Sequence, residues 1–108
     1  LILHGGNTRR VMFRALGPSL KSGGVAIPGT LQNPSMELFD GNGTLLRSND
    51  NWPDAPNVGE IVATGLAPPE NNESAILLSL GPGNYTAVIR GVNRTTGIAL
   101  AEAYKLNN

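Results

Sequence analysis

The chain has 108 residues, which is enough for one two-layer hydrophobic core and too few for two independent ones. Its 8 basic and 8 acidic side chains give a formal net charge of +0, so the composition disfavours a nucleic acid or an anionic membrane as partner. Cysteine is absent, which excludes a disulfide framework and a thiolate metal site. We expect a single β-sandwich domain over residues 1–108, a mature or excised segment of a longer secreted chain, because it opens on Leu1 and not on Met.

The N-terminal third predicts two strands and a long connection. Residues 1–3 are an apolar strand candidate, and a glycine-rich turn leads to a second candidate at residues 10–16. We expect these two strands to pair as a first hairpin. Gly17-Pro18-Ser19 ends the second strand, and the glycines and prolines of residues 20–32 predict a surface crossover with at most one helical turn.

The middle of the chain predicts a hairpin and a short helix. Residues 36–39 and 44–47 flank Asn42-Gly43, a pair that readily adopts the positive φ angles of a tight turn. Residues 57–64 are the only stretch with helical spacing, and Gly65 ends it.

The C-terminal third alternates apolar and polar residues with the period of a β-strand. Residues 74–80, 85–90 and 97–104 predict a three-stranded meander, and the whole pattern predicts an all-β, jelly-roll-like antiparallel sandwich. The last strand places Ala99, Ala101 and Ala103 on one face, because side chains alternate from face to face. We expect this alanine face to lie either in the sandwich interior or beneath another subunit.

Four side chains around the predicted hairpin are candidate calcium ligands. Asp40, Asn42, Asp50 and Asp54 supply hard oxygen donors of the kind that calcium prefers. The alternative is turn chemistry, in which the same side chains hydrogen-bond the local backbone without a metal. We expect no other cofactor.

Trp52 is the only tryptophan. It lies in a predicted loop, directly between Asn51 and Pro53 and three residues after Asn49. An exposed indole beside amide groups would stack on a sugar ring, which predicts a glycan-binding site at Trp52, Asn49 and Asn51. The alternative is a Trp52 that folds back as a lid on the sandwich and donates its N–H to a carbonyl.

Arg14 and Glu102 each lie between apolar neighbours inside a predicted strand. We predict that they form a structural ion pair across the sheet, because a buried charge without a partner is expensive. The functional alternative is an anion-binding Arg14.

No catalytic pattern is found in the sequence. His4 is the only histidine, no Gly-x-Ser-x-Gly elbow is present, and one histidine without cysteines is a poor zinc site. We therefore expect a protein that is not an enzyme.

Several stretches together resemble a known kind of module. They are residues 14–20, 37–43, 48–52, 73–76, 82–93 and 95–104. In combination they are similar to a repeat module of large secreted and surface proteins of environmental bacteria, distantly similar to pre-peptidase C-terminal β-sandwich domains. The resemblance implies an antiparallel β-sandwich, export and a non-catalytic role, and it carries no catalytic residue to this chain. Members begin with a further apolar strand, so the resemblance also implies that residues 1–3 are a truncated or exposed edge.

These expectations lead to two hypotheses of function. The first is an extracellular or cell-surface structural or adhesive module, which associates with itself or with tandem copies through strand edges and builds a surface layer or filament. The second is a calcium- or carbohydrate-binding accessory domain of a secreted hydrolase. Neither involves nucleic acid or insertion into a membrane, since no apolar run approaches the roughly 18 residues that a span requires.

Overall fold

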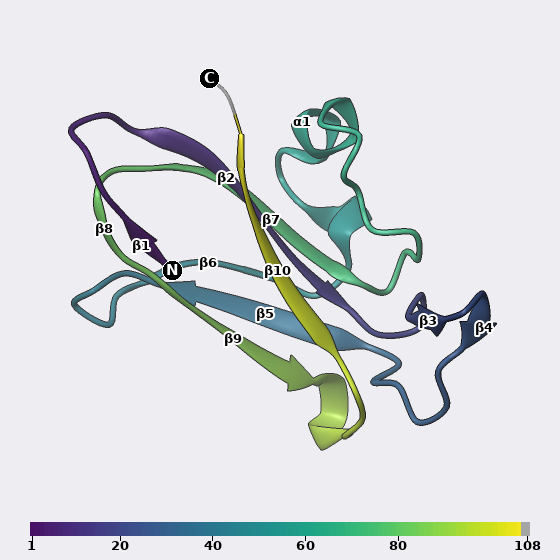
Figure 1. Cartoon of the computed structure of the whole chain (residues 1–108). Helices are drawn as coiled ribbons and strands as arrows, with labels where there is room; N and C mark the ends of the chain where they lie inside the picture. Colours follow the sequence, from purple (N-terminus) through teal and green to yellow (C-terminus); the bar gives the residue numbers. More distant parts are fainter. Residues whose placement is uncertain (107–108) are drawn as a thin grey trace.

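Two three-stranded antiparallel sheets face each other and make an all-β sandwich, as expected (Figure 1). The computed structural model describes residues 1–106. The first sheet has the order β10 (Leu100–Leu106), β2 (Arg9–Leu16), β7 (Ser74–Leu80). The second has the order β6 (Leu45–Asn49), β5 (Pro34–Phe39), β9 (Thr86–Gly91).

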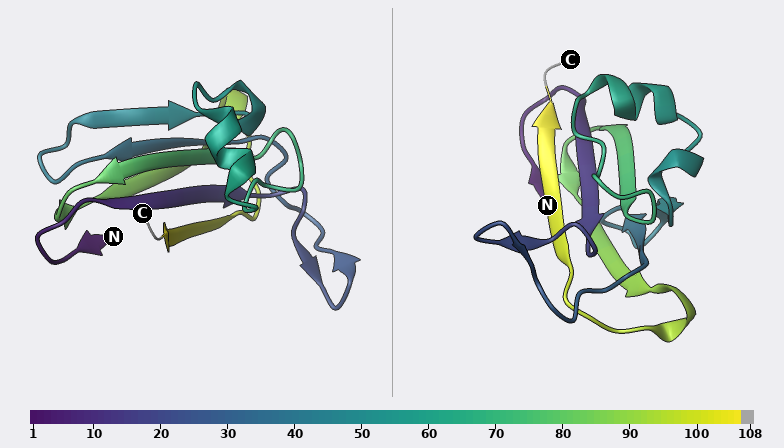
Figure 2. Two further views of the ribbon diagram at one scale, coloured as in Figure 1. Left: turned by 90° about the horizontal axis from the view of Figure 1, so that it is seen from above. Right: turned by 90° about the vertical axis from the view of Figure 1, so that its right-hand side faces the viewer.

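Smaller elements complete the chain. Two short strand pairs are β1 (Ile2–Leu3) with β8 (Gly83–Asn84) and β3 (Lys21–Ser22) with β4 (Val25–Ala26). The helical elements are η1 (Trp52–Asp54), α1 (Val58–Ala63) and η2 (Val92–Arg94). The β3–β4 hairpin projects away from the sandwich (Figure 2).

The space between the sheets holds the main hydrophobic core. Val11, Phe13 and Ala15 of β2 face Met36 and Leu38 of β5, and all five side chains are buried. Complete burial of a Val, Leu, Met or Phe side chain stabilises the fold by roughly 1.5–3 kcal/mol. The alternation of buried and half-buried residues along β5 follows from this arrangement, because β5 has the core on one face only.

The other face of the first sheet is covered as well. Met12, Ala75 and Leu77 pack there against Ala55 and Ile61, which the segment containing η1 and α1 supplies. The central strand β2 is therefore apolar on both faces, and its sequence runs through Val11, Met12 and Phe13 without a polar residue. The helix α1 confirms the expected helix at residues 57–64, and no helix among residues 1–106 has the length and apolar character needed to cross a bilayer.

The hairpin at Asn42-Gly43 is confirmed. Strands β5 and β6 pair antiparallel, and the N–H of Gly43 donates to the carbonyl of Asp40 at 3.1 Å. Gly43 has φ +80°, in the left-handed region that glycine tolerates best, which is the local reason for the turn at this position.

Three expectations about strand pairing are wrong. Residues 1–3 do not pair with β2, because β7 and β10 occupy both of its edges, and β1 instead pairs with β8. The three C-terminal strands form no meander, since β9 crosses to the second sheet and pairs with β5. The connection at residues 20–32 holds the small β3–β4 hairpin in place of a plain loop.

Candidate functional site

The β7 edge of the first sheet is closed by side chains. The N–H of Ala75 donates to Asn49 Oδ1 at 3.0 Å, and Asn57 Nδ2 donates to the carbonyl of Leu77 at 2.9 Å. Because these side-chain amides form hydrogen bonds with main-chain groups of β7, they protect this edge from pairing with another strand.

The edges of the second sheet are shorter or partly covered. Residue Leu1 lies beside the start of the β9 edge, where its amino group donates to the carbonyl of Tyr85 at 2.8 Å and its carbonyl accepts from the N–H of Tyr85 at 2.7 Å. Strand β6 has five residues, and its pairing with β5 is interrupted by an irregularity at Leu38 and Phe39. Bulges of this kind discourage edge-to-edge pairing.

Strand β10 forms the longest edge without such protection. It pairs with β2 in unbroken register over seven residues, from Leu100 opposite Leu16 to Leu106 opposite Arg10. It contains no proline, glycine or bulge, and no strand among residues 1–106 pairs with its other side. Figure 2 (right) shows β10 at the outer limit of its sheet, next to β2. Such an edge is a template for strand addition.

The sandwich is also open beneath β10. Ala101 and Ala103 lie opposite Ala15 and Phe13 of β2 and share their face, yet the two β2 residues are 0% and 3% exposed and the two β10 residues are exposed. The second sheet therefore does not extend far enough to cover the last strand. The expectation that the alanine face lies in the sandwich interior is therefore wrong for Ala101 and Ala103. The alternative, that this face lies beneath another subunit, stays a prediction.

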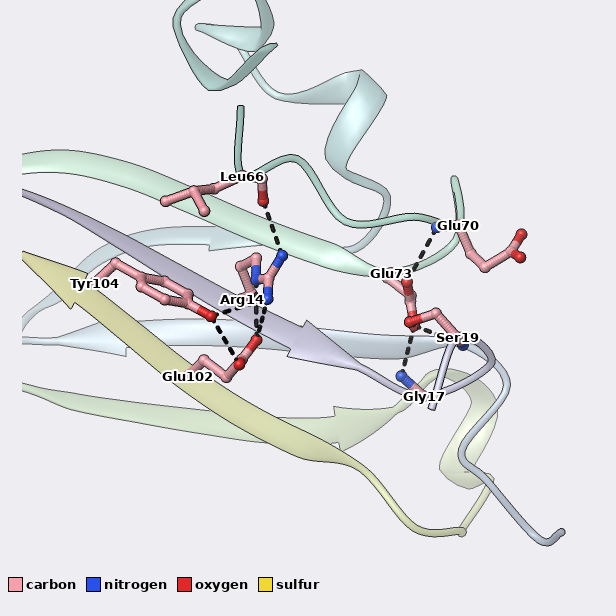
Figure 3. A network of polar contacts seen from close by, with 8 residues as sticks. All are labelled: Arg14, Gly17, Ser19, Leu66, Glu70, Glu73, Glu102 and Tyr104. Atoms are coloured by element: carbon pink, nitrogen blue, oxygen red, sulfur yellow. Dashed lines mark hydrogen bonds and ion pairs between the residues drawn. The ribbon is translucent and has the colours of Figure 1, made fainter. Parts of the chain in front are cut away.

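Arg14 and Glu102 form the predicted ion pair, which ties β10 to β2 (Figure 3). Arg14 Nε donates to Glu102 Oε1 at 3.0 Å, Nη1 to the carbonyl of Leu66 at 3.2 Å and Nη2 to the Tyr104 hydroxyl at 3.0 Å. The Tyr104 hydroxyl donates in turn to Glu102 Oε2 at 2.8 Å, and the guanidinium carbon lies 5.1 Å from the centre of the tyrosine ring. All three guanidinium nitrogens therefore have partners within the protein, which disfavours Arg14 as an anion-binding group.

Glu73 is a buried carboxylate that sequence reasoning did not identify. Its Oε2 accepts from the N–H of Gly17 at 2.8 Å and from the N–H and hydroxyl of Ser19 at 3.1 and 2.7 Å, while Oε1 accepts from the N–H of Glu70 at 3.1 Å (Figure 3). The side chain is 0% exposed. A signal was present in the sequence: a single glutamate stands directly before the apolar strand that begins at Ser74.

The four candidate calcium ligands lie at two separate ends of the β5–β6 hairpin. Asp40 and Asn42 are in the turn, and Asp50 and Asp54 follow the far end of β6, where Asn49 pairs with Met36. Four strand positions separate the two ends by roughly 13 Å. Asp40 Oδ1 accepts from the N–H groups of Asn42 and Thr44 at 2.9 and 3.0 Å, which is the turn chemistry of the alternative interpretation. Among residues 1–106 no three acidic, histidine or cysteine side chains come together as a metal site.

Asp50 and Asp54 lie close enough to influence each other. Burial, and secondly the negative charge of Asp54, raise the pKa of Asp50 above its ordinary value of 3.8. The folded protein therefore holds this proton to a higher pH than the unfolded chain does. As a result, the stability that this proton contributes is fully present below the pKa of the unfolded chain and is lost as the pH rises through the pKa of the folded state.

The Asp50→Asn variant is expected to be more stable than the wild type near neutral pH, because it removes a negative charge that burial, and secondly the charge of Asp54, disfavours. The gain should shrink in acid, where Asp50 is protonated in both states. Thermal melts of both proteins at about pH 7 and about pH 3 measure it. A gain of equal size at both pH values would contradict this account of Asp50.

Trp52 lies in η1 and folds back on the sheet. Its indole Nε1 donates to the carbonyl of Glu70 at 3.1 Å, and its half-buried ring packs against the cluster around Met12. This is the lid of the alternative interpretation. Both side-chain amide atoms of Asn49 already have partners. Its Oδ1 accepts from the N–H of Ala75 in β7, and its Nδ2 donates to the carbonyl of Asn51 at 3.1 Å.

An open hollow of about 370 Å³ lies beside Trp52. It is lined by Asn51, Pro53, Asp54, Asn71 and Asn72. The structure thus brings Asn51 and Asp54 of the predicted sites together, without the indole ring in the lining.

Comparison of the chain with protein-family models, with curated proteins and with solved structures gives no match. The resemblance to a secreted bacterial repeat module therefore stays a prediction from the sequence.

Proposed function

We propose that this chain is a non-catalytic structural or adhesive β-sandwich module that acts outside the cell and associates with itself through strand edges. The single observation that carries the proposal is the β10 edge, which has seven residues in regular register and contains no bulge or proline. Main-chain hydrogen bonding between such edges joins subunits into layers or filaments.

The surface around this edge supports the proposal. Ile98 and Leu100, just before and at the start of β10, are 53% and 45% exposed, and the alanine face beside them is exposed too. Association would remove this apolar surface from water. The net charge of +0 means that copies of the chain do not repel one another strongly.

The use of the polar side chains also supports a structural role. The carboxylate of Glu73 and the guanidinium of Arg14 each make four hydrogen bonds within the protein, and both hold segments of the first sheet in place. These hydrogen bonds stabilise the first sheet, of which β10 is an edge strand. The extracellular location and the arrangement in tandem copies rest on the resemblance alone.

We expect the purified chain to form oligomers whose average mass rises with concentration, because edge pairing is a bimolecular reaction. Light scattering over a dilution series measures the mass, and electron microscopy of the concentrated sample shows whether layers or filaments form. A strictly monomeric profile at every concentration would refute self-association.

Calcium or glycan binding is a second candidate function, favoured by the hollow whose lining includes Asp54 and by Asp50, whose pKa is raised by burial and secondly by the charge of Asp54. Calcium should then raise the melting temperature of the wild type, a chelator should reverse the effect, and Asp50→Asn should abolish it. A calcium titration that gives neither heat nor a shift in melting temperature would refute calcium binding. A glycan array without any bound glycan would refute sugar binding.

A further inference from the structure

The sequence of β10 is complementary to itself when two copies run antiparallel. We propose that a second copy of this chain pairs with the free edge of β10 about a two-fold axis at Ala103, joining the two first sheets into one six-stranded sheet. This inference rests on the self-association proposed above and assigns its site, register and symmetry.

The structure singles out β10 among the four sheet edges. Side chains of Asn49 and Asn57 cap the β7 edge, Leu1 lies beside the start of β9, and β6 is short and interrupted. Only β10 offers a long regular row of main-chain donors and acceptors with an exposed apolar face beside it. A closed C2 pair is also the commonest symmetry of protein oligomers.

Symmetry limits the registers that are possible. A two-fold axis between antiparallel neighbours in one sheet stands normal to that sheet, so each side chain meets residues of its own face in the second copy. An axis at Glu102 would place the two Glu102 carboxylates opposite each other, which is unfavourable. An axis at Tyr104 would move Glu102 opposite the apolar Leu106 and leave Leu100 without an apolar partner in β10.

An axis at Ala103 gives favourable neighbours on both faces. On the outer face Leu100 meets Leu106 of the second copy, and Glu102 meets Tyr104 of the second copy. On the inner face the two Ala103 residues meet at the axis, and each Lys105 lies opposite Ala101, where its aliphatic stem covers the small side chain. No like charges meet within this stretch.

Ala103 is the position at which this register is tested most sharply. Because its side chain is exposed in the single chain, a substitution there leaves the fold intact. Ala103→Lys places two ammonium groups opposite each other at the axis, and Ala103→Glu places two carboxylates there. We expect each variant alone to associate at least about ten-fold more weakly than the wild type, and an equimolar mixture of the two to recover association through opposite charges.

Sedimentation velocity of the wild type, the two variants and their mixture measures these equilibria, with thermal melts to verify the fold. Val62→Lys is the matched control, since Val62 is 57% exposed on α1 and lies outside both β10 and its partner strand β2. It should associate like the wild type. An Ala103→Cys variant adds a direct measure of proximity, because the chain contains no cysteine of its own. A short bifunctional thiol reagent should link two copies at Ala103→Cys and not at Val62→Cys.

The outcomes separate the two proposals. A wild type that stays monomeric overturns self-association and the register with it. A wild type that associates while both charged variants and the cysteine variant behave like their Val62 controls leaves self-association standing and overturns the site at β10. Loss of association in both charged variants without recovery in the mixture overturns the axis at Ala103.

Discussion

Replacement of Glu73 by alanine is expected to lower the free energy of unfolding by about 3 kcal/mol or more. Four donors from two segments converge on this fully buried carboxylate: the N–H groups of Gly17, Ser19 and Glu70, and the Ser19 hydroxyl. Truncation removes four hydrogen bonds to a carboxylate, of which the bond from Gly17 is buried and the other three are partly buried, and hydrogen bonds to charged groups contribute roughly 1.5–3 kcal/mol each. For a domain of this size the melting temperature should fall by roughly 12 °C or more.

The neighbouring residue provides the matched control. Glu70 is exposed, and it contributes only main-chain groups to this network, so Glu70→Ala should change stability by less than about 0.5 kcal/mol. Ser19→Ala removes a single donor from Glu73 and should lie between the two variants. Urea unfolding monitored by Trp52 fluorescence gives all three values, and a Glu73→Ala variant as stable as Glu70→Ala would contradict this role.

Arg14→Met is expected to destabilise the protein by about 2 kcal/mol. The substitution leaves the Glu102 carboxylate with only the Tyr104 hydroxyl, in a place where its side chain is 24% exposed. Breaking a fully buried pair costs roughly 3–5 kcal/mol, and the partial access of solvent at Glu102 reduces this figure. The loss of stability should mainly affect the pairing of β10 with β2, since the ion pair joins these two strands.

A double-mutant cycle separates the pair from the packing around it. Arg14→Met with Glu102→Leu should lose less stability than the sum of the two single variants, because neither charge is then left without its partner. The control is Arg90→Met, which breaks the exposed Arg90–Glu37 pair and should cost less than about 1 kcal/mol. Arg14→Met with wild-type stability, measured by urea unfolding, would mean that the pair contributes nothing to the fold.

Local features of the fold were predictable from the sequence where one residue type has few alternatives. Asn42-Gly43 fixes a hairpin because glycine accepts the positive φ that the turn requires, and Gly65 follows a helix end for the same reason. The partnership of Arg14 and Glu102 was predictable because each charge is set among apolar neighbours in a strand, and an unpaired charge there would be expensive.

Strand partners were not predictable in the same way. Alternation along a strand shows which face is buried and carries no information about which strand lies beside it. Strand β9 leaves its neighbours in sequence because Gly81-Pro82-Gly83 redirects the chain toward the second sheet. The exposure of Ala101 and Ala103 is a property of the second sheet, which ends before it covers β10, and no residue of β10 encodes it.

The candidate site was predictable only in part. The sequence predicted association through strand edges without assigning the open edge, and the capping of β7 by Asn49 and Asn57 depends on contacts between segments 20 or more residues apart in sequence. The same is true of Glu73, which receives the N–H of Gly17 from 56 positions away. Hydrogen bonds between residues this far apart in sequence depend on how the two sheets and their connections pack in the folded protein.

Amide hydrogen exchange at several protein concentrations tests the central claim, the availability of the β10 edge, most directly. In dilute solution the outward-facing amides of Leu100–Leu106 should exchange fast, and they should become protected as the concentration rises, because a second copy then covers them. The amide of Ala75, already bound to Asn49, should show the same protection throughout. Protection of β10 that is independent of concentration, in a sample that light scattering shows to be monomeric, would contradict the account.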